Sequence, residues 1–209
     1  MKLNSLLKWS CLLSFLLFCS CGSPQKDAQR KLARELELRR ENEARSMRLY
    51  EQGIGAQKAS GARDAKQYFS ESLRFDGANV YAWMALGSCR FDEEDYYAAA
   101  EAFHQAAKLL PWRYEPHFNL GTVFESVGRF SDAIQAYETA LRLQPDQLQT
   151  MENLARAYIR ANQNPQRAKE LVDRALFSEE RPQWRRWLQL QSLRLTPTTR
   201  PADSPRGEP

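Results

Sequence analysis

The sequence has little of what a catalytic or metal-binding site needs. Of its 209 residues only two are histidines, His104 and His117, and only four are cysteines. The cysteines are not spaced as metal ligands, and the chain has no glycine-rich phosphate loop. We therefore expect no catalytic residue, no metal, no cofactor and no small-molecule substrate. Cys89 is expected to be a buried structural thiol rather than a nucleophile.

The sequence also lacks a concentration of positive charge. Its 30 Lys and Arg residues face 26 Asp and Glu residues, and the arginines are interleaved with acidic residues along the chain. Nucleic-acid-binding domains gather their cations on one face or stripe, so we expect no nucleic-acid partner. Hydrophobic residues make up 43% of the chain, enough to bury a core and to exclude wholesale disorder.

No stretch at the N-terminus is long enough to span a membrane. The apolar run from Trp9 to Phe18 has about ten residues, whereas a spanning helix needs about twenty. Lys2 and Lys8 precede this run, and a basic start before a short apolar stretch is typical of a secretory signal peptide. The alternative is a short membrane anchor that is never removed. The residues that follow favour cleavage.

Those residues are Phe18-Cys19-Ser20-Cys21, which resemble the lipobox of bacterial lipoproteins, with Phe18 in place of the usual Leu. The resemblance implies that residues 1–20 are removed and that Cys21 receives diacylglycerol, with palmitate-type chains, at the new N-terminus. Two or more acyl chains hold a protein stably on a membrane. Gly22 is not acidic, which favours the outer membrane, facing the periplasm, in a host with two membranes.

Along the rest of the chain, similar residues recur at a fixed interval of 34 residues, as between positions 87 and 121 (121 − 87 = 34). It separates equivalent positions in four series: Gly87, Gly121 and Ala155; Ala99 and Ala133; Phe103 and Tyr137; Ala106 and Ala140. Apolar residues within each unit are spaced by three and four, which predicts helices. Gly128 can end one helix and Pro145 cannot continue the next. Each unit is therefore expected to be a helical hairpin that buries its apolar faces only in a stack.

This unit resembles the tetratricopeptide repeat. The residues that carry the resemblance in one unit are Trp83, Leu86, Gly87, Ala99, Phe103, Ala106 and Pro111, and the next unit repeats most of them. The resemblance implies an all-α, right-handed superhelical array of hairpins. We expect repeats at 46–79, 80–113, 114–147 and 148–181, the last looser and carrying one extra residue around 162–165.

Two segments flank the repeats. Residues 21–45 are strongly charged and are expected to form the lipid anchor and a solvated helical spacer that runs into the first repeat. Residues 182–195 are expected to form a capping helix with Trp184, Trp187 and Leu188 on one side. The alternation at 188–195 also fits a strand, but a helical array has no sheet for it to join. Residues 196–209, rich in Pro and Thr, are expected to be disordered.

In arrays of this family the first helix of each hairpin lines a concave groove that can take an extended segment or a helix of a partner. Carrying those positions over gives Tyr50, Glu51, Ile54, Tyr81, Met84, Ala85, Ser88, Phe118, Asn119, Thr122, Glu152, Asn153, Arg156 and Arg160. We expect Tyr81, Met84 and Phe118 to point away from the core between the helices. Some relatives clamp a C-terminal carboxylate with two Asn and several cations. Here Asn119 fits, but Met84, Ser88, Gln149 and Asn153 stand where the cations and second Asn belong, which argues against a clamp.

The resulting hypothesis is a membrane-anchored scaffold for protein–protein interaction in the bacterial cell envelope. Its plan resembles tetratricopeptide lipoproteins that help to assemble type IV pili, secretins or outer-membrane proteins. One alternative is an adaptor that docks and localises an envelope hydrolase. A third hypothesis, of another class, is an enzyme or a metal carrier.

Overall fold

The computed structural model describes residues 24–60 and 62–196, and this part of the chain is helical without strands. The helices are α2 (Pro24–Ser60), α3 (Ala62–Phe75), α4 (Val80–Asp92), α5 (Tyr96–Leu109), α6 (Tyr114–Ser126), α7 (Phe130–Leu143), α8 (Leu148–Ala161), α9 (Pro165–Ser178) and α10 (Pro182–Leu195). None of these described helices combines the length and the hydrophobicity needed to cross a membrane. The expected signal peptide, Cys21 and nearly all of the tail lie outside the described residues.

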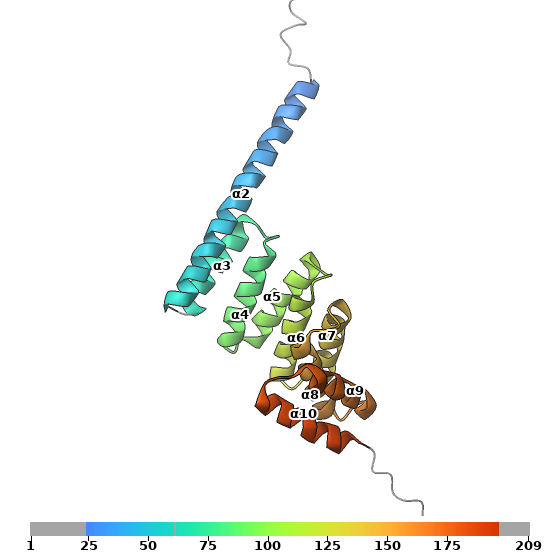
Figure 1. Ribbon diagram of the computed structural model, residues 1–209. Helices are drawn as coiled ribbons and strands as arrows, with labels where there is room; N and C mark the ends of the chain where they lie inside the picture. The colour runs from blue at the N-terminus through green and yellow to red at the C-terminus, as the bar shows by residue number, and fades with distance from the viewer. Residues whose placement is uncertain (1–23, 61, 197–209) are drawn as a thin grey trace, which may run out of the picture.

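The helices stack in chain order. Each packs against the next, so that α2–α3, α4–α5, α6–α7 and α8–α9 form four hairpins, and α10 packs on α9. Figure 1 shows the N-terminal half of α2 projecting beyond the stack. One helix of 37 residues, Pro24–Ser60, thus includes the described part of the expected spacer and the first helix of the first hairpin. Residues 182–195 form α10 and not a strand.

A close approach of helix to ring holds each of the first three hairpins together. A Cβ added to Gly53 would lie 2.5 Å from the Phe69 ring, and one added to Gly87 would lie 2.6 Å from the Phe103 ring. The same pairing recurs between Gly121 and Tyr137. Because the three rings are almost fully buried, only glycine lets the paired helices come this close. The sequence positions that recur from repeat to repeat are therefore the positions at which the two helices of each hairpin touch.

The fourth hairpin takes up its extra residue at the end of its first helix. α8 has 14 residues where α4 and α6 have 13. Asn162 then ends α8 in the left-handed conformation, with φ of 51°, and the Asn164 side chain caps α9. Beyond the extra residue, Ala168 and Ala175 are fully buried. The shifted residues therefore return to the packing positions of the earlier repeats.

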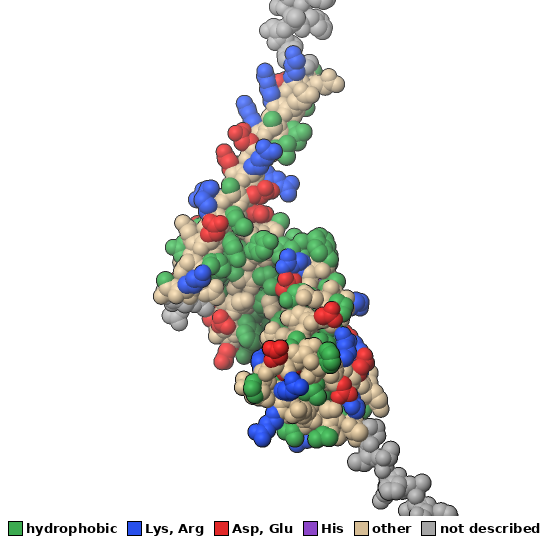
Figure 2. All heavy atoms as spheres, viewed as in Figure 1, with side chains coloured by type: hydrophobic (Ala, Val, Ile, Leu, Met, Phe, Trp, Pro, Cys, Tyr) green, Lys and Arg blue, Asp and Glu red, His purple; other side chains and the backbone are tan. Residues whose placement is uncertain are grey.

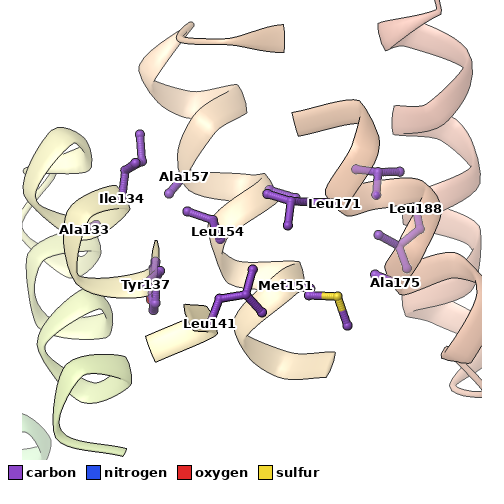
Figure 3. Close-up of a cluster of buried hydrophobic side chains, with 12 residues drawn as sticks. Ala133, Ile134, Tyr137, Leu141, Met151, Leu154, Ala157, Leu171, Ala175 and Leu188 are labelled. Atoms are coloured by element: carbon purple, nitrogen blue, oxygen red, sulfur yellow. The ribbon is translucent and has the colours of Figure 1, made fainter. Parts of the chain in front are cut away.

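The last two hairpins and α10 share one core. Figure 3 shows side chains of α7, α8, α9 and α10 converging, among them Tyr137, Leu154, Leu171 and Leu188. Leu188 of α10 is completely buried and closes this end of the core. Gln189 stands one repeat interval after Ala155, where the hairpins have Gly or Ala, and it is exposed. A side chain of this size on α10 obstructs the close approach of a further helix there.

Candidate binding groove

A hollow of about 240 Å³ spans the first helices of three successive hairpins. It is lined by Ser88, Phe91 and Asp92 of α4, Phe103 of α5, Phe118, Asn119 and Thr122 of α6, and Gln149 and Asn153 of α8. Five of the residues expected to line the groove therefore come together here: Ser88, Phe118, Asn119, Thr122 and Asn153. The wall combines three aromatic rings with amide and hydroxyl groups.

Some polar side chains in this hollow already have hydrogen-bond partners within the protein, and others have none in the described part of the chain. The Ser88 and Thr122 hydroxyls donate to carbonyl oxygens of their own helices, those of Met84 and Phe118, at 3.1 and 3.2 Å. By contrast, the side-chain amides of Asn119 and Gln149 have no hydrogen-bond partner within the described part of the chain. A primary amide can donate and accept at once. These two amides can therefore hydrogen-bond the main chain of a bound polypeptide.

Arg156 and Arg160, which were expected to line the groove, are not among the residues that line the hollow, and both lie beside a buried carboxylate. Glu125 of α6 is 8% exposed and accepts hydrogen bonds from Arg156 Nε and Nη2 of α8 at 2.7 and 2.9 Å. Arg160 Nη1 lies 3.6 Å from the same carboxylate. The hydrogen bonds to Glu125 raise the pKa of Arg156. The two arginines expected to present charge to a ligand thus share a counter-ion within the protein.

The same carboxylate is tied to the core. The Tyr137 hydroxyl donates to Glu125 Oε2 at 3.1 Å and lies 3.2 Å from Thr122 Oγ1. Asn153 Nδ2 donates to that hydroxyl at 3.4 Å, while Asn153 Oδ1 accepts from Arg156 at 3.0 Å. Burial is the main cause that raises the pKa of Tyr137, so its hydroxyl stays a donor at neutral pH. Asn153 is therefore part of a structural network.

The remaining expected residues lie elsewhere. Tyr81 and Met84 line a second, largely apolar hollow of about 160 Å³, with Val80, Leu110, Arg113, Glu115 and Pro116. The Tyr50 ring lies 6.0 Å from the Tyr81 ring and 5.9 Å from the Phe69 ring. Ile54 packs on the core cluster of the first hairpins. The expected single groove surface is thus divided between two hollows.

Three expectations are wrong in detail. Phe118 does not point away from the core, because its ring lies 5.8 Å from the Tyr137 ring and packs on the core cluster of the last hairpins. Met84 likewise packs on a core cluster, that of α5 and α6. Glu152 is 1% exposed and is covered by Arg181, whose Nη2 lies 2.7 Å from it, so it does not line the groove. Phe118 and Met84 thus both line a hollow and pack against the core between the helices.

Glu125 is the residue that sequence reasoning missed. Its equivalents one repeat before and after are Phe91 and Ile159, both apolar. A single acid in an apolar column, followed about one repeat later by an arginine, is the signal that points to a buried ion pair. Phe91, which also lines the hollow and packs edge-on against Tyr96 with centroids 5.5 Å apart, was missed as well.

The described part of the chain also contains acidic, histidine and cysteine side chains. No group of three or more His, Cys, Asp or Glu side chains within residues 24–60 and 62–196 is arranged to hold a metal ion. Cys89 is fully buried, and burial is the main cause that raises the pKa of its thiol. A raised pKa leaves little thiolate at neutral pH, which fits a structural thiol.

Comparison with known proteins identifies the repeats. The family description "Tetratricopeptide repeat" matches residues 50–111 and 114–147. The tetratricopeptide repeat-containing protein trd-1 of Caenorhabditis elegans is 27% identical over 126 residues, which are 59% of this chain but only 16% of the worm protein. The chain thus spans a small part of that relative.

Solved structures share the fold. MamA of Desulfovibrio magneticus superposes with a TM-score of 0.65 at 16% identity, over 72% of this chain and 85% of that one. PilF of Pseudomonas aeruginosa gives 0.59 at 20% identity, over 74% and 68%. Identities this low establish the fold alone. The expected all-α repeat array is confirmed, and residues 50–111 and 114–147 match the tetratricopeptide repeat.

Proposed function

We propose that this array of tetratricopeptide repeats is a lipid-anchored, non-enzymatic scaffold of the bacterial cell envelope that holds a segment of a partner protein in its groove. The observation that carries the proposal is the hollow across α4, α6 and α8, where the amides of Asn119 and Gln149 flank the rings of Phe91, Phe103 and Phe118. An extended segment would use its main chain on the amides and one apolar side chain on the rings.

The proposed location rests on the sequence around Cys21. Acyl chains on that residue would fix one end of the chain at a membrane, and α2 begins three residues later, at Pro24. Assembly of an envelope complex, such as a type IV pilus, a secretin or the outer-membrane machinery, is the role that suits an anchored scaffold. PilF shares the fold with this chain, so a pilus complex is the first one to test.

The anchor can be tested directly. Cells expressing the protein would be labelled with a fatty acid analogue, with the unsubstituted chain and Cys21→Ser side by side. We expect label on the unsubstituted chain only, and release or mis-sorting of Cys21→Ser on fractionation. Equal labelling of both chains would show that Cys21 is not the acylated residue, and an unlabelled native chain would remove the anchor from the proposal.

The groove is tested by placing a photo-crosslinking residue at Asn119, in intact cells. The matched control carries it at Gln135, an exposed residue of α7 outside the hollow. We expect Asn119 to crosslink one defined partner that Gln135 does not. The substitutions Asn119→Ala and Gln149→Ala should then weaken capture of that partner by about two- to twelvefold each, because one hydrogen bond contributes roughly 0.5–1.5 kcal/mol. Equal crosslinking from both positions would place the binding surface elsewhere.

A further inference from the structure

The projecting half of α2 has an uneven distribution of charge. Its first eleven residues, 24–34, carry four cations, Lys26, Arg30, Lys31 and Arg34, and a single acid, Asp27. The next eleven, 35–45, carry four glutamates against three arginines. Residues 24–34 are all exposed. Figure 2 shows Lys and Arg side chains gathered toward the free end of this helix, with acidic side chains more frequent nearer the repeats.

The cations are also arranged on one side. Lys26, Arg30 and Arg34 follow one another at intervals of four, so they form a stripe along the helix, which we call the basic stripe. Ser46 and Gly53 are buried on the side of α2 that meets α3: Ser46 hydrogen-bonds Ser72, and Gly53 contacts Phe69. At about 100° per residue, Ser46 and Gly53 lie about 160° and 140° around the helix from Arg30. Lys26 and Arg30 therefore face away from the hairpins, and Arg34, about 120° and 100° from Ser46 and Gly53, lies toward the side of α2.

The acids beside the cations do not cancel the stripe. Arg30 lies 3.9 Å from Asp27 and Lys31 lies 3.9 Å from Glu35, and all four side chains are more than 60% exposed. Exposed pairs at this distance are weak and are screened by salt. Arg30 in the stripe and Lys31 beside it can therefore exchange these weak pairs for contacts with a stronger negative surface.

We propose that the basic stripe lies on an anionic phospholipid surface, so that α2 runs along the membrane and carries the hairpins on its far side. The inference rests on the proposed acylation of Cys21. Since Pro24 is only three positions after Cys21 in the sequence, the lipid would hold the start of α2 close to the headgroups. Lys and Arg side chains near an anionic leaflet each strengthen binding by about fivefold. In this arrangement the lipid on Cys21 and the basic stripe both bind the same membrane surface. The hairpins, with their groove, lie on the other side of α2 and stay accessible to partners.

The test uses the chain from Gly22 onward, which has no acyl group and retains every described residue. Binding is measured by co-sedimentation with vesicles of phosphatidylglycerol and phosphatidylcholine in equal parts, and with pure phosphatidylcholine. We expect binding to the anionic vesicles only, and its loss at high salt. No binding to anionic vesicles, or equal binding to neutral ones, would overturn the proposal.

A matched pair of variants separates the stripe from net charge. Arg30→Gln/Arg34→Gln and Arg39→Gln/Arg40→Gln each remove two exposed arginines of α2. We expect the first to lower vesicle affinity by about twenty-fivefold, at about fivefold per cation, and the second by much less. Equal losses would mean that net charge alone binds, and would refute the stripe. Because the protein used is not acylated, this result does not depend on the fatty-acid labelling of Cys21, so the two proposals can fail separately.

Discussion

Replacing Gly121 with alanine tests the contact that defines each hairpin. The added Cβ would contact the Tyr137 ring, lying 2.5 Å from Cδ1 and closer still to Cε1. Atoms cannot approach this closely, so the ring or the helix must move. The Tyr137 ring is completely buried, and its hydroxyl is held by Thr122 and Glu125. The ring therefore has no open space into which it can retreat.

The expected magnitude follows from two opposed terms. Overpacking a close-packed core costs about 1–3 kcal/mol, and the pinned ring favours the upper part of that range. Alanine in a helix interior is more favourable than glycine by about 1 kcal/mol. Gly121→Ala should therefore lower the free energy of unfolding by about 1–2 kcal/mol. Gly55 is the control: it is an exposed residue of α2, and an added Cβ would have no atom within 4 Å. Gly55→Ala should raise stability by up to about 1 kcal/mol.

The assay is urea unfolding of the chain from Gly22, followed by the helical circular dichroism signal. Stacked repeats need not unfold in one step, so midpoints are compared as well as fitted free energies. The two substitutions are chemically identical and both lie in helices, and the expected shifts have opposite signs. If Gly121→Ala raised the midpoint as Gly55→Ala does, the hairpin contact would not have the geometry described.

Further predictions concern packing and pH. Ala140 is fully buried while His104 is exposed, so Ala140→Leu should lower the melting temperature and His104→Ala should not. Phe118→Ala should lower the urea midpoint by removing a ring that packs on Tyr137, which unchanged unfolding would contradict. Burial, aided by a hydrogen bond with Glu179, raises the pKa of Glu152 from 4.5 to about 7, so the folded state binds this proton more tightly than the unfolded state. The melting temperature should therefore rise as pH falls from about 8 to about 5, and Glu152→Gln should flatten that rise; an unchanged slope in Glu152→Gln would assign it to other groups.

Local and periodic information sufficed to predict the hairpins. Gly87 and Phe103 recur one repeat later as Gly121 and Tyr137, and each glycine meets its own ring in the structure. The pairing joins two helices connected by a turn of three residues, so it is nearly local in sequence. Helix type and packing face follow from such short-range spacings. The resemblance to the tetratricopeptide repeat, carried over residue by residue, placed Ser88, Asn119 and Asn153 in the groove, and all three line one hollow.

The parts that could not be predicted depend on individual side chains meeting across repeats. Arg181, in the turn between α9 and α10, covers Glu152 of α8, with its Nη2 2.7 Å from the carboxylate. Averaging over repeats assigns Glu152 to the groove, because its helical position is one that faces the groove elsewhere. Only the conformation of the turn before α10 brings Arg181 over it. Sequence periodicity contains no information about such a contact, since Arg181 has no counterpart with the same role in the other repeats.

Glu125 shows why the groove of this chain is poorly suited to an acidic ligand. Burying a carboxylate in a column otherwise occupied by Phe91 and Ile159 is costly unless it is paired. Arg156 supplies that pairing with two hydrogen bonds, and Tyr137 supplies a third from the core. An acidic peptide that recruited Arg156 would have to leave Glu125 underpaired within the same network. Arg156 is thus committed to this internal network, and in the proposed scaffold selection among partners would fall to the uncommitted amides of Asn119 and Gln149 and to the aromatic wall beside them.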